Sequence, residues 1–193
     1  MNKEAIMLFE VESGIYSVRI EDEGFRNFFN NGLESESYDR IFDPGNNINW
    51  EFHGVFSVTI TRNMQSTKLA LVGSNFCNSK NCAVIDDKKL LVVMPLEIFV
   101  LDLNKANLTD FIVFNELLGF FLEIHFYKDG YLIYGEIVIL KLNKMLSEEW
   151  SFGGSDIFVS MSKNPAFSIK DGLIYLEDFN GKQYIVDENG MEK

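Results

Sequence analysis

Residues 97–105, Glu-Ile-Phe-Val-Leu-Asp-Leu-Asn-Lys, are the first copy of a phrase that recurs along the chain. Residues 136–144 read Glu-Ile-Val-Ile-Leu-Lys-Leu-Asn-Lys, and residues 182–190 read Lys-Gln-Tyr-Ile-Val-Asp-Glu-Asn-Gly, a degenerate copy. The copies begin 39 and 46 residues apart. This period is typical of a repeat built from four short strands.

Turn signals around the third copy indicate an antiparallel meander. Asp171-Gly172 and Asn180-Gly181 flank the apolar-rich run 173–177, and Asx-Gly pairs favour two-residue hairpin turns. Asp129-Gly130 repeats the pattern one copy earlier. Each phrase is therefore expected to be the fourth, outer-edge strand of its unit, with the charges of Asp102, Lys141 and Asp187 protecting that edge.

The chain is predicted to divide at Asp43-Pro44-Gly45-Asn46-Asn47, the strongest boundary signal. Residues 1–45 are expected to form strands at 6–11 and 15–20, with a short helix as an option at 23–29. They would act as a cap or as a fourth blade. Residues 46–193 are expected to hold three repeats, at about 50–105, 106–145 and 146–190, the last with a strand at 157–160.

The third repeat resembles the repeat of PQQ-type β-propellers. The matching residues are Trp150, Asp171-Gly-Leu-Ile-Tyr-Leu176, Asp178-Phe-Asn-Gly-Lys182, Tyr184-Ile-Val-Asp187 and Gly190. The resemblance covers residues 150–190 closely and 50–144 more distantly. It implies an all-β fold of tandem antiparallel four-stranded meanders, a short (three- to four-blade) or incomplete β-propeller with an N-terminal strand-rich cap. Enzymes of that family hold their quinone in an eight-bladed ring. Because this chain has room for only three or four blades, no quinone or other cofactor is expected here.

One segment admits two structures. Residues 109–118 place apolar side chains at 111, 114, 117 and 118, which is a helical spacing, and Thr109 could cap such a helix. The Phe, Ile and Val residues of the same segment favour a strand.

The acidic composition constrains the partner. The net charge is −12, and residues 1–50 carry ten acids against four bases. Because an acidic protein repels phosphate backbones, nucleic acid is not expected as a partner. A basic protein fits the charge better, although solubility alone also accounts for it.

The sequence predicts neither a leader nor a membrane span. Acidic residues break the apolar run at the start of the chain, and no uncharged apolar stretch reaches the roughly 20 residues that cross a bilayer. Two cysteines, Cys77 and Cys82, are too few for a disulfide scaffold. A cytoplasmic protein without a membrane partner is therefore expected.

No catalytic or metal signature is present in the sequence. A Ser-His-Asp triad built on His53 or His125 would need a nucleophilic serine in a Gly-x-Ser-x-Gly turn, and the sequence contains no such motif. The two cysteines lack the second Cys or His pair that a zinc site needs. Asp178-x-Asn180-Gly181 imitates part of a calcium loop, but Leu176 stands at its first ligand position. A hairpin turn explains the same residues better.

Five residues remain as candidates for a pocket or an interface: Glu97, Glu136, Trp50, Trp150 and Asp156. The favoured interpretation is a non-catalytic protein-interaction module, narrowed to a bacterial immunity-type protein that neutralises a basic partner. The alternative is a carbohydrate-binding protein or a carboxylate-dependent hydrolase with a blade-top pocket. Glu97 and Glu136 would serve the hydrolase if their carboxylates lay about 5–10 Å apart.

Overall fold

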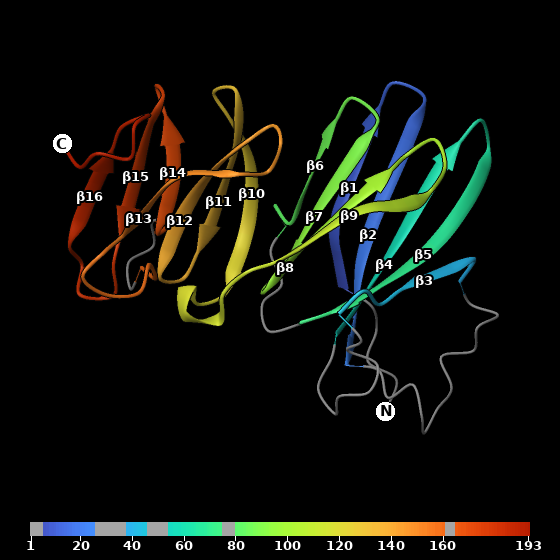
Figure 1. Ribbon diagram of the computed structural model, residues 1–193, viewed down its shortest axis with the longest axis horizontal. Coiled ribbons are helices and arrows are strands. Elements are labelled where there is room, and N and C mark those ends of the chain that lie inside the picture. The colour runs from blue at the N-terminus through green and yellow to red at the C-terminus, as the bar shows by residue number, and fades with distance from the viewer. Residues whose placement is uncertain (1–5, 26–37, 46–53, 75–79, 161–164) are drawn as a thin grey trace. The chain divides into compact units, whose positions relative to one another are not determined.

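The computed structural model describes residues 6–25, 38–45, 54–74, 80–160 and 165–193 (Figure 1), and the chain divides into two compact units. Unit 1 ends at Phe114 and unit 2 begins at Asn115. Each unit contains two sheets that share a hydrophobic core, and all but one of the described strand pairs are antiparallel. The expected all-β class with four-stranded antiparallel sheets is confirmed.

The first sheet of unit 1 contains the two N-terminal strands. Its order is β1 (Ile6–Ser13), β2 (Tyr16–Phe25), β4 (Gly54–Arg62), β5 (Gln65–Gly73) and β3 (Arg40–Phe42), with β3 parallel to β5. The strands expected at 6–11 and 15–20 are thus present as β1 and β2. β1 pairs with β2, and β2 pairs with β4.

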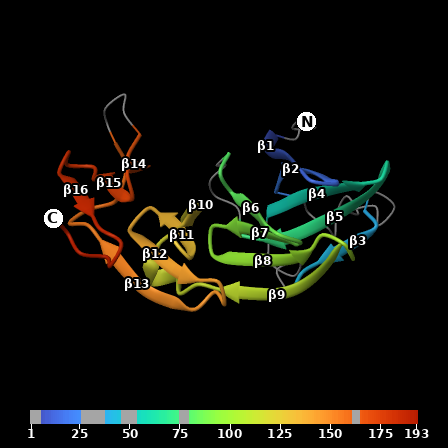
Figure 2. The ribbon, with the colours of Figure 1, turned by 90° about the horizontal axis from the view of Figure 1, so that it is seen from above.

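The second sheet of unit 1 is a four-stranded meander. It consists of β6 (Ala83–Asp86), β7 (Lys89–Met94), β8 (Glu97–Asp102) and β9 (Asn107–Val113). Its apolar face packs on the first sheet, where Phe56, Leu90 and Phe99 belong to one buried cluster. Figure 2 shows the two sheets lying against each other.

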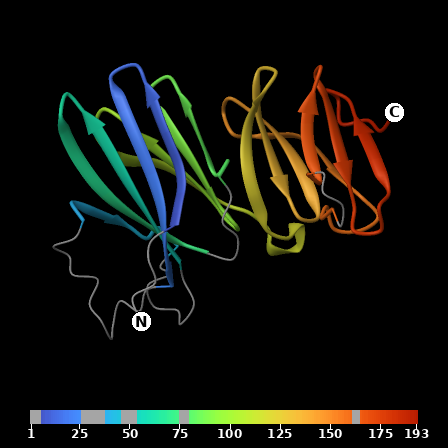
Figure 3. The same ribbon diagram turned by 180° about the vertical axis from the view of Figure 1, so that it is seen from behind.

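Unit 2 repeats this plan. One sheet consists of β10 (Phe121–Tyr127), β11 (Gly130–Gly135), β12 (Val138–Asn143) and β13 (Glu148–Gly153). The other consists of β14 (Phe167–Lys170), β15 (Leu173–Glu177) and β16 (Gln183–Val186), and Figure 3 shows the two as neighbours. Their shared core includes Tyr134, Phe158 and Tyr184.

The recurring phrase supplies the third strand of each sheet: β8, β12 and β16. The expected outer-edge position is wrong for the first two copies, because β9 and β13 continue the sheet beyond them, whereas β16 is the last strand of its sheet. Val186 continues the pattern with an isolated bridge to Glu192. Lys141 is accordingly 2% exposed, inside a sheet and not at its edge.

Two local expectations are also settled. Residues 109–118 are divided between the alternatives, since β9 ends at Val113 and a short 3₁₀ helix covers Glu116–Leu118 with Asn115 as its cap. Residues 157–160 form no strand, and this irregular segment is fixed instead by the buried ring of Phe158. Residues 23–25 continue β2, and the rest of the optional helix lies outside the described residues.

Candidate functional site

Glu97 is the most deeply buried of the candidate residues that the structure describes. Its side chain, at the start of β8, faces the end of β5, where Ser74 donates to it from the backbone N (3.2 Å to Oε2) and from Oγ (2.5 Å). Burial raises the pKa of Glu97, and these hydrogen bonds oppose that rise. Gly73 makes room for the carboxylate, because a Cβ there would lie 3.1 Å from Oε2. Glu97 therefore joins two sheets.

Glu136 and Asp156 are associated with the irregular segment 156–160 of unit 2. The carbonyl of Glu136 accepts from the Phe158 backbone N at 2.5 Å. The Asp156 carboxylate accepts from Asn180 Nδ2 at 2.7 Å. Glu97 lies in unit 1 and Glu136 in unit 2.

The segment 156–160 is held by one buried aromatic ring. Phe158 is fully buried, and its carbonyl accepts from the Tyr134 hydroxyl at 2.6 Å. Gly154 makes room for this ring, since a Cβ there would lie 2.7 Å from it. Because Phe158 points into the core, its neighbours Ile157 and Val159 are left exposed, at 38% and 37%.

These exposed residues belong to a small apolar surface with acidic neighbours, which we call the 156–160 surface. The Phe179 backbone N donates to the carbonyl of Ile157 at 2.9 Å, and the Phe179 side chain is 48% exposed. Asp156 adjoins Ile157, and Glu177 accepts from Ser160 Oγ at 2.6 Å. The surface thus combines Ile157, Val159 and Phe179 with two carboxylates. Single exposed apolar side chains are ordinary, whereas several from neighbouring segments can mark a contact site.

The turn beside this surface is stabilised by Asp178. Its side chain is fully buried and accepts from the Tyr184 hydroxyl at 2.7 Å and from Ser155 Oγ at 2.9 Å. The hydrogen bond from Tyr184, more than any other contact, lowers the pKa of Asp178. Backbone N–H groups of Asn180 and Lys182 also donate to it, as the hairpin-turn interpretation predicted.

Trp150 packs against the C-terminal turn. Its Nε1 donates to the carbonyl of Glu188 at 2.9 Å, and its ring lies where a Cβ on Gly190 would be, at 2.8 Å. Gly190 has φ +78°, a conformation that favours glycine. Trp150 and Gly190, both among the residues that carry the resemblance, therefore meet within one unit.

The histidines and cysteines considered in the sequence analysis either have ordinary structural contacts or lie outside the described residues, as Trp50 also does. His125 Nε2 is 2.7 Å from Glu123 Oε2 on β10, and burial raises the pKa of the Cys82 thiol to about 12, which makes it a poor nucleophile. Trp50, His53 and Cys77 lie outside the described residues. Within the described ranges, no three His, Cys, Asp or Glu side chains gather to hold a metal ion, and no helix is long and apolar enough to cross a membrane.

A cavity of about 240 Å³ lies elsewhere, in unit 1, and none of the described candidates lines it. Its walls come from the end of β4, the start of β5 and the turn between β8 and β9. The sequence analysis did not single out these residues. No motif or spacing in the sequence marks them, because two separate segments of the chain supply the lining.

No protein-family profile matches this chain, and no curated protein matches its sequence. Among solved structures, the dihydro-heme d1 dehydrogenase NirN in complex with DHE has a TM-score of 0.52 at 12% identity, over 74% of this chain and 34% of that chain. BBS1N in complex with ARL6DN, soaked with mercury, has a TM-score of 0.47 at 14% identity, over 73% of this chain and 47% of that chain.

The fold is β-propeller-like. The likeness to NirN supports this level of the resemblance expected from the sequence, without supporting the PQQ-type repeat in particular. At such low identity it shows the fold alone, and this chain covers only about a third of that neighbour's length. Function has to be argued from the surfaces and cavities of the chain itself.

Proposed function

We propose that the chain is a protein-interaction module and that its 156–160 surface contacts a basic protein. The observation that carries the proposal is the group of exposed Ile157, Val159 and Phe179 side chains beside Asp156 and Glu177. Apolar anchors with charges at their margin are the usual anatomy of a contact site.

The charge of the unit supports a basic partner. Residues 115–193 carry 13 acids and seven bases. Complementary charge raises the rate at which partners meet and rejects partners of the same sign. The narrower form of the proposal is an immunity-type protein that neutralises a basic toxin by covering its functional surface. A PQQ-type origin of the repeats and their division at about 105 and 145 belong to the same proposal.

The surface is well prepared for binding because its backbone is fixed in advance. Phe158 is anchored in the core, and the backbone hydrogen bond from Phe179 ties the segment to the neighbouring turn. A partner would therefore order few groups when it binds, which lowers the entropic cost of association.

The experiment compares capture by three forms of the chain. The wild type, the double variant Asp156→Lys/Glu177→Lys and the control Glu10→Lys/Glu12→Lys are immobilised and offered a lysate of the source cells, with the products of neighbouring genes included. Glu10 and Glu12 are exposed on β1 in the other unit, so the control makes the same charge change elsewhere. Capture is compared at about 50 mM and about 500 mM salt, since salt screens surface charges.

We expect one basic protein to be retained at low salt by the wild type and the control, and the 156–160 variant to bind it about tenfold more weakly or worse. Phe179→Ala provides a second variant that leaves both carboxylates in place. The proposal fails if no protein is retained at low salt, or if the 156–160 variants capture the same protein as strongly as the control does.

A further inference from the structure

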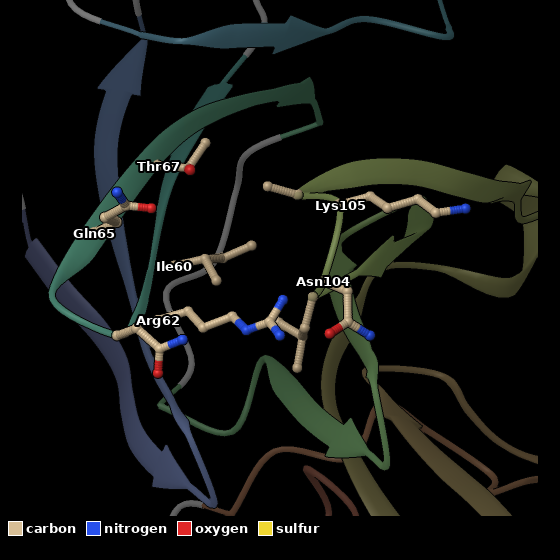
Figure 4. A pocket seen from close by; sticks show the side chains of 9 residues that line it. Ile60, Arg62, Gln65, Thr67, Asn104 and Lys105 are labelled. Atoms are coloured by element: carbon tan, nitrogen blue, oxygen red, sulfur yellow. The ribbon is translucent and has the colours of Figure 1, made fainter.

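The cavity of unit 1 combines an apolar wall with polar groups. Ile60, Leu103 and Ala106 supply buried apolar side chains, while Arg62, Asn104, Gln65 and Thr67 supply polar ones. Asn63 and Lys105 complete the lining. In Figure 4, Arg62 extends from the end of β4 toward the turn that carries Asn104.

Arg62 is an unusual cation for this chain. Its guanidinium makes no hydrogen bond or ion pair with any described residue, and its Nε is buried without a partner. Two other cations of the unit are paired with acids: Arg19 with Glu21 at 2.6 Å and Lys68 with Glu23 at 3.2 Å. A buried donor without an acceptor costs stability. In a chain with 29 acids and 17 bases, an unpaired arginine beside a cavity indicates that the acceptor comes from outside.

Tyr16 positions the two polar groups that meet at the cavity. The Arg62 guanidinium lies over its ring, 5.9 Å from the centroid, and its hydroxyl donates to Asn104 Oδ1 at 2.5 Å. With Oδ1 occupied, the Nδ2 hydrogens are the part of the Asn104 amide that remains to donate. Tyr16 is itself buried, at 7% exposure, so this arrangement is set before any ligand arrives.

The turn that forms the opposite wall is also fixed. Arg40 Nη1 donates to the carbonyls of Lys105 and Ala106, each at 3.0 Å. Asp102 Oδ1 accepts from the backbone N of Asn104 at 2.8 Å and of Lys105 at 3.0 Å. Both walls of the cavity are thus held by hydrogen bonds that do not involve the Arg62 guanidinium.

We propose that this cavity binds a small organic anion whose carboxylate accepts from Arg62 and Asn104 while its apolar body packs on Ile60, Leu103 and Ala106. A guanidinium fork matches a planar carboxylate with two parallel hydrogen bonds. Since a cavity of 150 Å³ holds benzene, about 240 Å³ suits a ligand of roughly ten non-hydrogen atoms. The site belongs to unit 1 and is independent of the 156–160 surface.

Benzoate is the probe, with benzamide as its neutral counterpart and phenyl phosphate as the phosphate counterpart. Binding is followed on the full chain by NMR, through the Nε–H signal of Arg62 and the side-chain amide signal of Asn104. We expect saturable shifts with benzoate at a dissociation constant near 1 mM, about that of a small polar ligand, and at least tenfold weaker binding of benzamide. Tighter binding of phenyl phosphate would assign the anion as a phosphate instead of a carboxylate and would overturn the carboxylate assignment.

Two substitutions distinguish a specific contact of Arg62 with the anion from a general effect of positive charge. Arg62→Gln should weaken benzoate at least tenfold, whereas Lys105→Gln, the same change in charge, should alter it by less than about twofold, because the Lys105 amine points away from the cavity in Figure 4. Asn104→Asp keeps an acceptor for Tyr16 and places a carboxylate at the cavity, so it should abolish binding even if Arg62→Gln does not fold. No saturable shift by about 10 mM benzoate, equal binding of benzamide, or equal effects of Arg62→Gln and Lys105→Gln would each overturn the proposal.

Discussion

Because the ammonium of Lys141 is buried, we expect removal of its acidic partner to destabilise the fold more than removal of the lysine itself. Its side chain is 2% exposed, and Nζ donates to Glu149 Oε2 at 2.7 Å, to Asp129 Oδ1 at 3.3 Å and to the carbonyl of Leu142 at 3.2 Å. The two carboxylates are far more exposed, at 38% for Glu149 and 83% for Asp129. If the pair is broken, the lysine is therefore the charge that stays buried without a partner, whereas the carboxylates can reach water.

Removing the acid and removing the base should have different effects. Leaving a buried charge without its partner costs about 3–5 kcal/mol. Because Asp129 and the Leu142 carbonyl remain, we expect Glu149→Ala to lower the free energy of unfolding by about 2 kcal/mol. Lys141→Met removes the buried charge itself and releases two carboxylates that water can reach. It should change the free energy by no more than about 1 kcal/mol in either direction.

Urea unfolding of both single variants and of the double variant measures this coupling. Trp150 lies opposite Lys141 in the β12–β13 register, so its fluorescence reports on the right sheet. The double variant should be about as stable as Lys141→Met, which gives an interaction energy near 2 kcal/mol. In thermal unfolding, Glu149→Ala should lower Tm by about 4–8 °C. The reasoning is refuted if Lys141→Met costs more than Glu149→Ala, or if the two effects simply add.

Three further substitutions test single features. The pKa of Glu97 is raised above its ordinary 4.5, so the unfolded chain loses this proton first and the free energy of unfolding should fall as pH rises from 4.5 through the folded-state pKa. Glu97→Gln should make this fall with pH smaller, as measured by urea unfolding at a series of pH values. An unchanged dependence on pH would contradict the burial argument. Tyr184→Phe removes the main cause of the lowered pKa of Asp178, so the pKa of this carboxyl, measured by NMR, should rise. The free energy of unfolding at pH 7 should drop, and its loss below pH 3.8 should become smaller. An unchanged pKa of Asp178 would show that the Tyr184 hydroxyl is not the main cause. Gly130→Ala places a Cβ 2.1 Å from a backbone oxygen and should cost more than about 2 kcal/mol, whereas the control Gly153→Ala, with its nearest atom at 3.6 Å, should stay within about 0.5 kcal/mol in the same assay.

The strands were predictable where the local pattern was strong. The Asx-Gly turns at Asp129-Gly130 and Asp171-Gly172 correctly placed β10, β11, β14 and β15, because hairpin turns depend on nearby residues. The segment 157–160 failed for the opposite reason. Its apolar run has the composition of a strand, but the burial of Phe158 between two sheets decides its course, and that contact involves residues distant in sequence.

The cavity was beyond the reach of sequence reasoning. Arg62 and Asn104 are brought together by the packing of one sheet on another, and no spacing rule connects them. Nor could the sequence show that Arg62 has no carboxylate partner among the described residues, since pairing depends on which acids the fold brings near. The predicted candidates were chosen as repeat-equivalent residues, and such equivalence follows shared architecture more than shared chemistry.

The register error in the recurring phrase has a physical explanation. The charges of Asp102, Lys141 and Asp187 suggested an edge strand, since charged residues commonly protect edges. In the structure each has a local role: Asp102 and Asp187 accept backbone N–H groups of the turns that follow them, and Lys141 is paired inside its sheet. A charge at the end of a strand can therefore mark a turn that begins the next strand. Because Asp102 and Asp187 cap such turns, the phrase predicts one more strand after itself, which β9 supplies after β8 and the bridge to Glu192 begins to supply after β16.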